Sequence, residues 1–310
     1  MSPANPYLGR TIIGSAQFGM PYGITNQRGQ VPESEVQAIL ARAWNSQISF
    51  IETAAVYGTS ERVLGRILVN FPAFGIISKI PAVTGDYIGP SEIERLGVSV
   101  SHSLEALQRN RFDALLIHAG LDLFKPGSQR LVEFLQLARS SGRASRIGVS
   151  IYEAREVDRV LDLFKPDIVQ MPVNLFDQRL IQSGHVAKLR AAGVETHGRS
   201  AFLQGVLLAD PKDLPENLQR FSHALTACSD FLARHALSRL AASLGFVMEQ
   251  SGVDKVVVGV TSLRELDNIL NALSHPFVLP RMEELACGDL DLIDPRRWPP
   301  SQPARAASTS

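Results

Sequence analysis

Apolar residues recur along most of the chain in two alternating patterns. Short runs with β-branched residues, such as RTII at 10–13 and GIISKI at 75–80, predict strands. Longer segments with apolar side chains three and four positions apart predict amphipathic helices. One of them is the segment 31–47, in which Pro32 and acidic residues mark the first turn. Strands and helices that alternate in this way are typical of an α/β protein.

The alternation continues almost to the end of the chain and gives eight strand and helix pairs. Neighbouring strands are expected to be parallel, because a helix connects each one to the next. Eight such pairs predict a (β/α)8 TIM barrel, with an open doubly wound sheet as the alternative. We expect one barrel domain over residues 1–294, followed at 295–310 by a Pro-, Ser- and Ala-rich tail that is partly disordered.

Some segments depart from the regular pattern. The glycines of GSAQFGMPYG, at 14–23, lack the spacing of a dinucleotide fingerprint, and with no helix expected directly after the strand we interpret this loop as close-packed lining. The segment 201–217 is predicted to be a long loop with the character of a functional lid. A helical region at 218–250 is expected to break near Ser229, whereas 179–193 is expected to form one helix that ends at a glycine.

Composition excludes several classes of partner. Lys plus Arg and Asp plus Glu both number 31, so the chain has no excess basic surface for nucleic acid or anionic lipid. Cys228 and Cys287 form neither a disulfide framework nor a zinc pattern, and we predict no metal site. No apolar run approaches the roughly 20 residues of a membrane span, and the first residues lack a secretory signal. We therefore expect a cytoplasmic protein, with its oligomeric state unassigned.

Polar side chains close three consecutive predicted strands. Glu52 follows the apolar run at 48–51, Lys79 lies at the end of the third strand, and His118 closes the fourth. Tyr57 follows Glu52 in the loop that leads to the next helix. Because the carboxyl ends of barrel strands meet at one mouth, we expect these four side chains to lie together.

An acid, a phenol, an amine and an imidazole at one mouth indicate proton transfer. A nearby ammonium favours a phenolate, so Lys79 is expected to lower the pKa of Tyr57. Glu52 would keep that amine charged, and His118 would hydrogen-bond a substrate carbonyl oxygen. The hydride that carbonyl reduction also requires implies a nicotinamide cofactor. Taken singly, each of these residues is more often structural or solvated, so the hypothesis depends on their joint occurrence.

Nearly the whole chain resembles the aldo-keto reductase superfamily, in the bacterial branch that includes oxidoreductases of sugar and polysaccharide metabolism. The resemblance is carried by TIIGSAQFGMPYG, FIETAAVYGTSERVLG, IISK, ALLIH, IGVS, VQMPVNLFD, RSAFLQGVL and VVVGVTSLRELDNIL. It implies a (β/α)8 barrel and hydride transfer from NADP(H), or less often NAD(H), to a carbonyl compound such as an aldehyde, a ketone or a sugar. The reverse reaction, oxidation of an alcohol, is implied equally.

The resemblance also assigns roles to the strand-end residues. The catalytic tyrosine of the family, its general acid and base, falls on Tyr57, its lysine on Lys79 and its histidine on His118. The family aspartate is replaced by Glu52, whose extra methylene displaces the carboxylate by roughly 1.5 Å unless the strand end shifts. A misplacement near 1 Å can cost about a hundredfold in rate. We expect activity that is reduced or retuned, with an altered pH dependence.

The cofactor contacts that the resemblance implies lie on the later strands and the loops after them. They comprise Ser150, Gln170 and Asn174 at the nicotinamide end, Arg199 in place of a stacking aromatic residue, Ser200, and the stretches 201–205 and 259–262 for the pyrophosphate and adenosine, with Phe202, Gly205, Gly259, Val260, Thr261 and Ser262. Arg264 would bind the 2′-phosphate of NADP(H), whereas Glu265 would repel it and could hold ribose hydroxyls. NADP(H) is favoured on this basis.

Two other functions stay open at this point. A nicotinamide-nucleotide-binding regulatory protein with weak turnover would fit the substitution at Glu52. A barrel that uses Lys79 as a Schiff-base amine in aldol or isomerase chemistry is disfavoured, because the adjacent carboxylate would keep that amine protonated. Aromatic residues expected at the substrate wall are Phe18, Tyr22, Phe124, Phe202 and Trp298.

Overall fold

The strands of the chain close into one barrel. In a computed structural model, which describes residues 5–214 and 216–298, eight parallel strands pair in sequence order and the last also pairs with the first. Their bounds are Thr11–Gly14 (β1), Phe50–Glu52 (β2), Gly75–Ile80 (β3), Phe112–Ile117 (β4), Ala144–Ser150 (β5), Ile168–Pro172 (β6), Glu195–Arg199 (β7) and Lys255–Gly259 (β8). The predicted (β/α)8 barrel is confirmed, and the open sheet is excluded.

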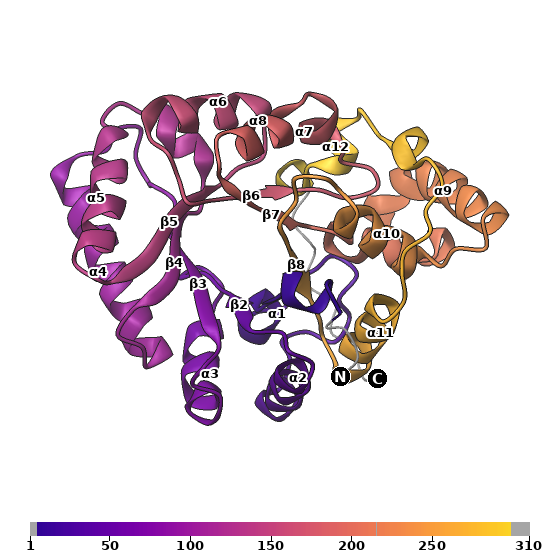
Figure 1. The fold of residues 1–310 in the computed structure, drawn as a ribbon, viewed down its shortest axis with the longest axis horizontal. Helices are drawn as coiled ribbons and strands as arrows, with labels where there is room; N and C mark the ends of the chain where they lie inside the picture. The colour runs from indigo at the N-terminus through magenta and orange to yellow at the C-terminus, as the bar shows by residue number, and fades with distance from the viewer. Residues whose placement is uncertain (1–4, 215, 299–310) are drawn as a thin grey trace, which may run out of the picture.

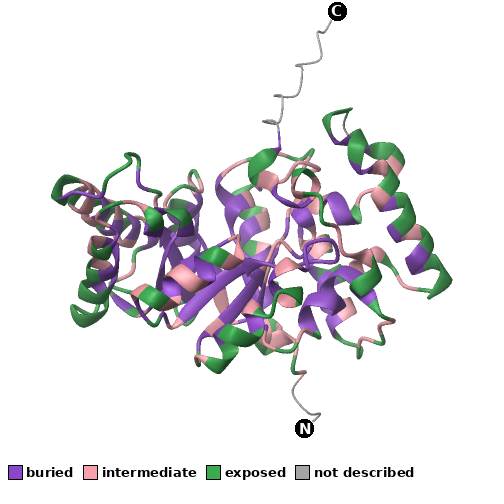
Figure 2. Cartoon of the chain, turned by 90° about the horizontal axis from the view of Figure 1, so that it is seen from above, coloured by how far each residue is buried: buried purple, intermediate pink, exposed green. Residues whose placement is uncertain are grey.

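Helices surround the barrel (Figure 1). The α-helices are α1 (Ala16–Gly19), α2 (Glu33–Asn45), α3 (Ser60–Ile67), α4 (Pro90–Leu107), α5 (Gln129–Ser140), α6 (Ala154–Leu163), α7 (Arg179–Gln182), α8 (His185–Ala191), α9 (Ser222–Arg234), α10 (Arg239–Met248), α11 (Leu263–Leu273) and α12 (Leu290–Ile293). Short 3-10 helices are η1 (Leu8–Arg10), η2 (Leu68–Asn70), η3 (Gly120–Phe124), η4 (Leu203–Leu208), η5 (Pro211–Asp213), η6 (Glu216–Phe221), η7 (Met282–Leu285) and η8 (Pro295–Arg297). In Figure 2, exposed residues lie on the outer faces of the helices and buried strands lie at the centre, as the amphipathic patterns of the helices predict.

Two groups of apolar side chains fill the two sides of the barrel wall. The larger group lies between strands and helices and includes Ile13, Ile51 and Leu115. The smaller group fills the barrel interior and consists of Ile12, Ile77, Ala114, Leu116 and Ile168, all 0 % exposed. Side chains alternate between the two sides of a strand, and the interior of such a barrel is a packed core rather than a pore.

The same alternation sets up the polar mouth. Lys79 lies two positions after Ile77 on β3, and Gln170 two positions after Ile168 on β6, so each polar side chain points to the same side as its apolar predecessor. His118 follows Leu116 in the same register, directly after the end of β4. The apolar interior thus ends in a layer of polar side chains at the carboxyl ends of the strands.

Several predicted boundaries were wrong. A four-residue helix, α1, follows β1 almost directly, although none was expected. The predicted helix at 179–193 divides into α7 and α8, because Gly184 adopts a positive φ of 78° between them. The break expected near Ser229 lies instead between α9 and α10, where Ala236 has a φ of 53°. Ser229 lies within α9, where its hydroxyl donates to the Leu225 carbonyl 2.6 Å away.

The start of the expected tail belongs to the folded domain. Residues 295–297 form η8, and Trp298, which is 8 % exposed, packs edge to face on Phe221 with ring centroids 5.4 Å apart. The folded part therefore extends past the expected boundary at residue 294, while 299–310 lie outside the described residues. Within the described ranges, no helix is both long and apolar enough to cross a bilayer.

Candidate active site

A cavity of about 340 Å³ lies at the carboxyl ends of the strands, and all four predicted catalytic side chains line it. Glu52 is the last residue of β2, Lys79 the penultimate residue of β3, and His118 the first residue after β4. Tyr57 enters from the loop between β2 and α3. The structure thus brings together the four residues that the strand-end argument selected.

The loop that carries Tyr57 is fixed against the loop after β1. The backbone amide of Thr59 donates to the Gly19 carbonyl at 3.1 Å, and the hydroxyl of Ser60 lies 2.7 Å from that of Ser15. A side chain at position 19 would collide with the Tyr57 carbonyl, so only glycine permits this approach. The glycine-rich segment after β1 therefore acts as close-packed lining that sets the position of Tyr57.

Three side chains form a continuous polar contact. Lys79 ion-pairs with Glu52 and donates through Nζ to the hydroxyl of Tyr57 at 3.1 Å. The Tyr57 hydroxyl in turn lies 3.3 Å from Glu52 Oε1. His118 approaches the Tyr57 ring edge to face, with centroids 5.9 Å apart. The longer side chain of Glu52 therefore still reaches both lysine and tyrosine.

Burial dominates the electrostatics of the phenol and the amine. Loss of solvent raises the pKa of Tyr57, whereas the positive charge of Arg199 acts to lower it. Burial lowers the pKa of Lys79 well below its ordinary value, and Arg199 acts in the same direction. Glu52 opposes this change at Lys79, since a carboxylate in contact favours the ammonium. The expectation that the pKa of Tyr57 would be lowered is therefore wrong, because burial outweighs the nearby cations.

Burial also sets the charge of the imidazole. It lowers the pKa of His118 to about 3, with contributions from the positive charges of Lys79 and Arg199. His118 is therefore neutral at physiological pH. A neutral imidazole carries one N–H donor, which suits a hydrogen bond to a carbonyl oxygen.

The lowered pKa of His118 predicts a loss of stability in acid. The unfolded imidazole binds a proton near its ordinary pKa of 6.5, but the folded one does so only at about 3. The free energy of unfolding should therefore fall as the pH decreases through this window and be fully retained above it. Urea unfolding between pH 7 and pH 4 should give a shallower dependence for His118→Gln than for wild type. The matched control, exposed His102→Gln, should keep the wild-type slope, and equal slopes for all three proteins would contradict the assignment.

The opposite wall of the cavity carries a buried amide without partners. Gln170 is 0 % exposed, and within the described ranges neither its Nε2 nor its Oε1 has a hydrogen-bond partner. Ser150, at the end of the neighbouring strand β5, lines the same wall. Buried polar groups are normally paired, so this amide is suited to a ligand that offers both a donor and an acceptor. The carboxamide of nicotinamide has this donor and acceptor set.

Arg199 extends from β7 across this wall. Its Nε donates to the Ser150 hydroxyl at 3.3 Å, and Nη2 donates to the Ile151 carbonyl at 3.0 Å. Its Cζ lies 4.1 Å from the ring centroid of Tyr152. The guanidinium is thus already stacked on a tyrosine of the protein itself.

The other predicted cofactor residues divide into two groups. Ser200, Phe202 and Gly259 line the cavity. The remaining ones lie outside its lining: Asn174, Gly205, Val260, Thr261, Ser262, Arg264 and Glu265. The side-chain amide of Asn174 is used by the protein itself: its Oδ1 accepts from the amides of the second and third residues that follow, at 3.0 and 2.9 Å, and its Nδ2 donates to the Ser200 carbonyl at 3.2 Å. Its predicted place on the nicotinamide wall has no support from this geometry.

In the first turn of α11, Glu265 is engaged in hydrogen bonds, whereas Arg264 has no acceptor within the described residues. The carboxylate of Glu265 accepts from the Thr261 amide at 2.6 Å and from its hydroxyl at 2.8 Å. Ser262 caps the helix by accepting from the Glu265 amide at 3.2 Å. Arg264 is exposed on the same turn. The acid is therefore committed to the loop, and the arginine is the residue that faces solvent.

Some lining residues were missed by the sequence analysis, among them Gln17, Tyr152 and Arg296. Tyr152 lies two positions after the end of β5, so the rule that selected the other strand-end residues could have found it. Arg296 carried no such signal, because it lies in the segment interpreted as tail. Of the aromatic residues expected at the substrate wall, Tyr22 and Phe202 line the cavity.

The other expected wall residues lie elsewhere. Phe18 is 0 % exposed in the core and Trp298 is buried, whereas Phe124 is 43 % exposed outside the cavity lining.

The closed barrel and the polar mouth are the architecture expected of the aldo-keto reductases, a class of oxidoreductases. The Aldo/keto reductase family model matches residues 11–286, and the chain belongs to this family, whose members use nicotinamide cofactors. A solved structure of an aldo-keto reductase from Bacillus halodurans, in its holo form, is similar with a TM-score of 0.72 at 16% identity over 93% of this chain and 95% of that one. A Pseudomonas aeruginosa protein assigned to the aldo-keto reductases gives a TM-score of 0.63 at 20% identity over 85% and 89%. At these identities the structures support the fold.

Proposed function

We propose that the protein reduces an aldehyde or ketone to an alcohol, or catalyses the reverse, with NADP(H) as hydride carrier and Tyr57 as general acid and base. The observation that supports this most strongly is the contact of the Tyr57 hydroxyl with Lys79, 3.1 Å away, in a cavity that it shares with His118. The phenol is partly buried and reaches the cavity, as a proton donor to a bound carbonyl requires.

Each side chain has a separate task in the proposed reduction. A bound nicotinamide cofactor would supply the hydride that the carbonyl carbon accepts. Tyr57 donates its proton to the carbonyl oxygen as negative charge develops there, which completes the alcohol. Lys79 stabilises the phenolate that remains, and neutral His118 donates a hydrogen bond to the same carbonyl oxygen. Glu52 acts through Lys79 and is a positioning residue rather than a proton donor.

The proposed cofactor position follows from the unsatisfied groups of the cavity wall. Gln170 and Ser150 would hold the carboxamide of nicotinamide, because both line the wall and the amide of Gln170 lacks partners within the described residues. Backbone amides of the stretches 201–205 and 259–262 would bind the phosphates, apart from the Thr261 amide, which already donates to Glu265. Arg199 would lie beside the nicotinamide ring.

Nucleotide fluorescence and absorbance test this function in one assay series. NADPH or NADH is added to the protein, binding is followed by fluorescence, and oxidation is followed after addition of aldehydes, ketones and sugars. We expect binding followed by carbonyl-dependent oxidation of the nucleotide. Binding with only trace oxidation would instead favour the regulatory function, and absence of binding would contradict both.

Arg264 is the proposed source of a preference for NADP(H). Arg264→Gln is expected to raise the ratio of Kd for NADPH to Kd for NADH by about tenfold, because a charge-assisted hydrogen bond to the 2′-phosphate is lost. Fluorescence titration of both nucleotides measures this ratio. Exposed Arg234→Gln on α9 serves as the matched control and should leave it unchanged. A wild type that binds NADH more tightly would contradict the assignment of Arg264.

A further inference from the structure

Two guanidinium groups from distant parts of the chain meet at one tyrosine in the cavity wall. The Cζ of Arg199, from β7, lies 4.1 Å from the Tyr152 ring centroid, and the Cζ of Arg296, from η8, lies 3.8 Å from it. All three residues line the cavity that contains Tyr57. We propose that the carbonyl substrate carries an anionic group, a carboxylate or a phosphate, which binds to Arg199 and Arg296. This inference rests on the proposed function and adds the class of substrate to it.

The two like charges are held close together by contacts around them. Each lies near the same ring, so the two Cζ atoms are within roughly 8 Å of each other, where unscreened repulsion in a partly desolvated wall is appreciable. Tyr152 itself is fixed by its backbone amide, which donates to Glu156 at 3.1 Å. An anion that contacts both guanidinium groups from the cavity would offset this repulsion.

Arg199 has a positive charge that no carboxylate neutralises in the described parts of the chain. Its protein contacts are the hydroxyls of Ser150 and Ser200, at 3.3 and 3.4 Å, and the Ile151 carbonyl at 3.0 Å. The two hydroxyl contacts are long for hydrogen bonds of a charged donor. Nη1 therefore keeps most of its capacity for an acceptor supplied by a ligand.

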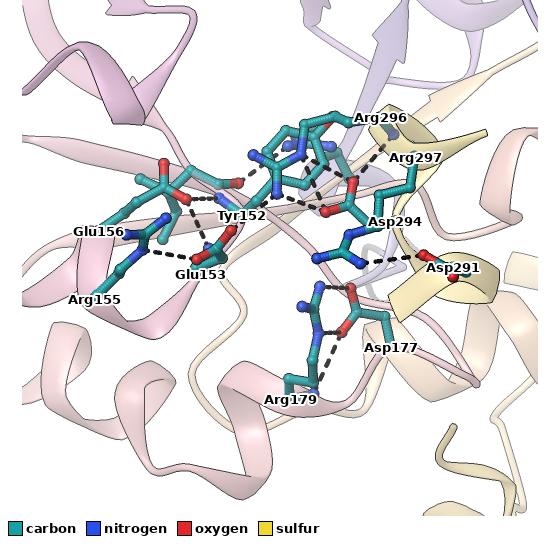
Figure 3. Close-up of polar contacts among 12 residues, drawn as sticks. Tyr152, Glu153, Arg155, Glu156, Asp177, Arg179, Asp291, Asp294, Arg296 and Arg297 are labelled. Atoms are coloured by element: carbon teal, nitrogen blue, oxygen red, sulfur yellow. Dashed lines mark hydrogen bonds and ion pairs between the residues drawn. The ribbon is translucent and has the colours of Figure 1, made fainter. Parts of the chain in front are cut away.

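Arg296 is positioned by carboxylates but also keeps a donor available. Figure 3 shows its guanidinium beside Asp294, with Nε and Nη2 at 2.9 and 2.6 Å from the two carboxylate oxygens. Nη2 also donates to Glu153 at 3.2 Å. Within the described residues, Nη1 has no acceptor from the protein. The carboxylates thus hold the guanidinium against the cavity and leave one of its edges for a ligand.

The charge balance of the wall also favours an anion. The lining contains three cations, Lys79, Arg199 and Arg296, against the single carboxylate of Glu52. The effect of Arg199 extends across the cavity, where its charge contributes to the lowered pKa values of Lys79 and His118. Glu52 pairs with Lys79, and Asp294 and Glu153 pair with Arg296 from outside the lining, so the surplus positive charge lies on Arg199, beside Tyr152.

The phosphates of the nucleotide are the other possible source of such an anion. Arg199 contacts Ser150, which lies at the proposed nicotinamide end rather than the proposed phosphate end. Arg296 comes from the segment after the last barrel helix, outside the stretches 201–205 and 259–262 that are proposed for the phosphates. The position of the pair therefore favours an anionic group on the substrate.

A comparison of matched carbonyl compounds tests the inference. The ratio of kcat/KM for 4-oxobutanoate to that for butanal, and for glyceraldehyde 3-phosphate to that for glyceraldehyde, is measured for wild type, Arg296→Gln and Arg297→Gln. Arg297 is the control, since it lies on the same 3-10 turn, pairs with Asp291 and is absent from the cavity lining. Each ratio comes from one preparation, so any loss of folded enzyme cancels.

We expect wild type to favour at least one anionic compound by tenfold or more in kcat/KM. Arg296→Gln should lose about tenfold of that preference, mainly through a raised KM, because a charge-assisted hydrogen bond is removed. Arg297→Gln should keep the wild-type ratio. Equal or better use of the neutral compounds by wild type would overturn the anion site and leave the reductase function intact. If the ratio of Arg296→Gln equalled that of wild type and its Kd for NADPH were raised, Arg199 and Arg296 would be assigned to the nucleotide. This result would also overturn the proposed anion site for the substrate.

A binding measurement separates this inference from the reductase function. Succinate and inorganic phosphate are titrated calorimetrically into wild type, Arg296→Gln and Arg297→Gln. Binding by wild type and Arg297→Gln, with about tenfold weaker binding by Arg296→Gln, would support the anion site even if no carbonyl compound were reduced. If wild type bound neither anion and showed no preference for anionic carbonyl compounds, the anion site would be rejected.

Discussion

Replacement of Tyr57 by phenylalanine is expected to lower kcat for carbonyl reduction by about 10²- to 10⁴-fold, the contribution usual for a positioned general acid. The substitution removes only the hydroxyl that contacts Lys79 and Glu52 and leaves the ring, which packs edge to face on His118. Nucleotide binding should change little, because the proposed nicotinamide contacts lie on the opposite wall. Steady-state kinetics and fluorescence titration measure the two quantities separately.

The matched control is Tyr87→Phe, which removes a phenolic hydroxyl from a side chain that is 56 % exposed and absent from the cavity lining. Its kcat should equal that of wild type. A Tyr57→Phe enzyme with a kcat within threefold of wild type would contradict the role of Tyr57 as proton donor. If both nucleotide affinity and kcat fell together, the substitution would have disturbed the cavity rather than the proton transfer.

The barrel and the grouping of Glu52, Tyr57, Lys79 and His118 in one cavity were predictable because both depend on local periodicity. Once the chain is divided into alternating strands and helices, side chains two positions apart share a side of the wall. A polar residue at the end of a strand therefore faces the mouth when it is in register with the interior apolar residues. Lys79 and His118 were located by this reasoning alone. Contact between them and Tyr57 then follows from closure of the barrel, which brings neighbouring strands together in sequence order.

The parts that could not be predicted depend on long-range packing. Arg296 lies in a Pro-rich segment without periodicity, and its place in the cavity depends on η8 packing against the loop after β5. The direction of the pKa change at Tyr57 depends on how completely the phenol is buried, which a list of neighbouring charges does not reveal. The break at Gly184 was missed and the break at Ala236 was predicted about seven residues too early, because both are set by positive φ angles that the apolar pattern does not reveal.

Replacement of Lys79 by methionine is expected to destabilise the protein by about 3–5 kcal/mol, because it leaves the carboxylate of Glu52 buried without its cation. The side chains of this pair are only 1% and 5% exposed. Carbonyl reduction should also be lost, since the phenolate of Tyr57 would have no ammonium beside it. Urea unfolding and steady-state kinetics measure the two effects. The exposed pair of Arg42 and Asp267 supplies the control, and Arg42→Met should cost no more than about 1 kcal/mol.

The double variant Glu52→Gln with Lys79→Met distinguishes the structural role of the pair from its catalytic role. Removing both charges should restore most of the lost stability, because no uncompensated ion remains in the barrel. It should not restore turnover, since the proton donor still lacks the lysine that stabilises its anion. A double variant as unstable as Lys79→Met would show that the unpaired carboxylate is not the cause of the loss. If turnover recovered together with stability, Lys79 would act by holding the fold of the mouth and not by stabilising the phenolate of Tyr57.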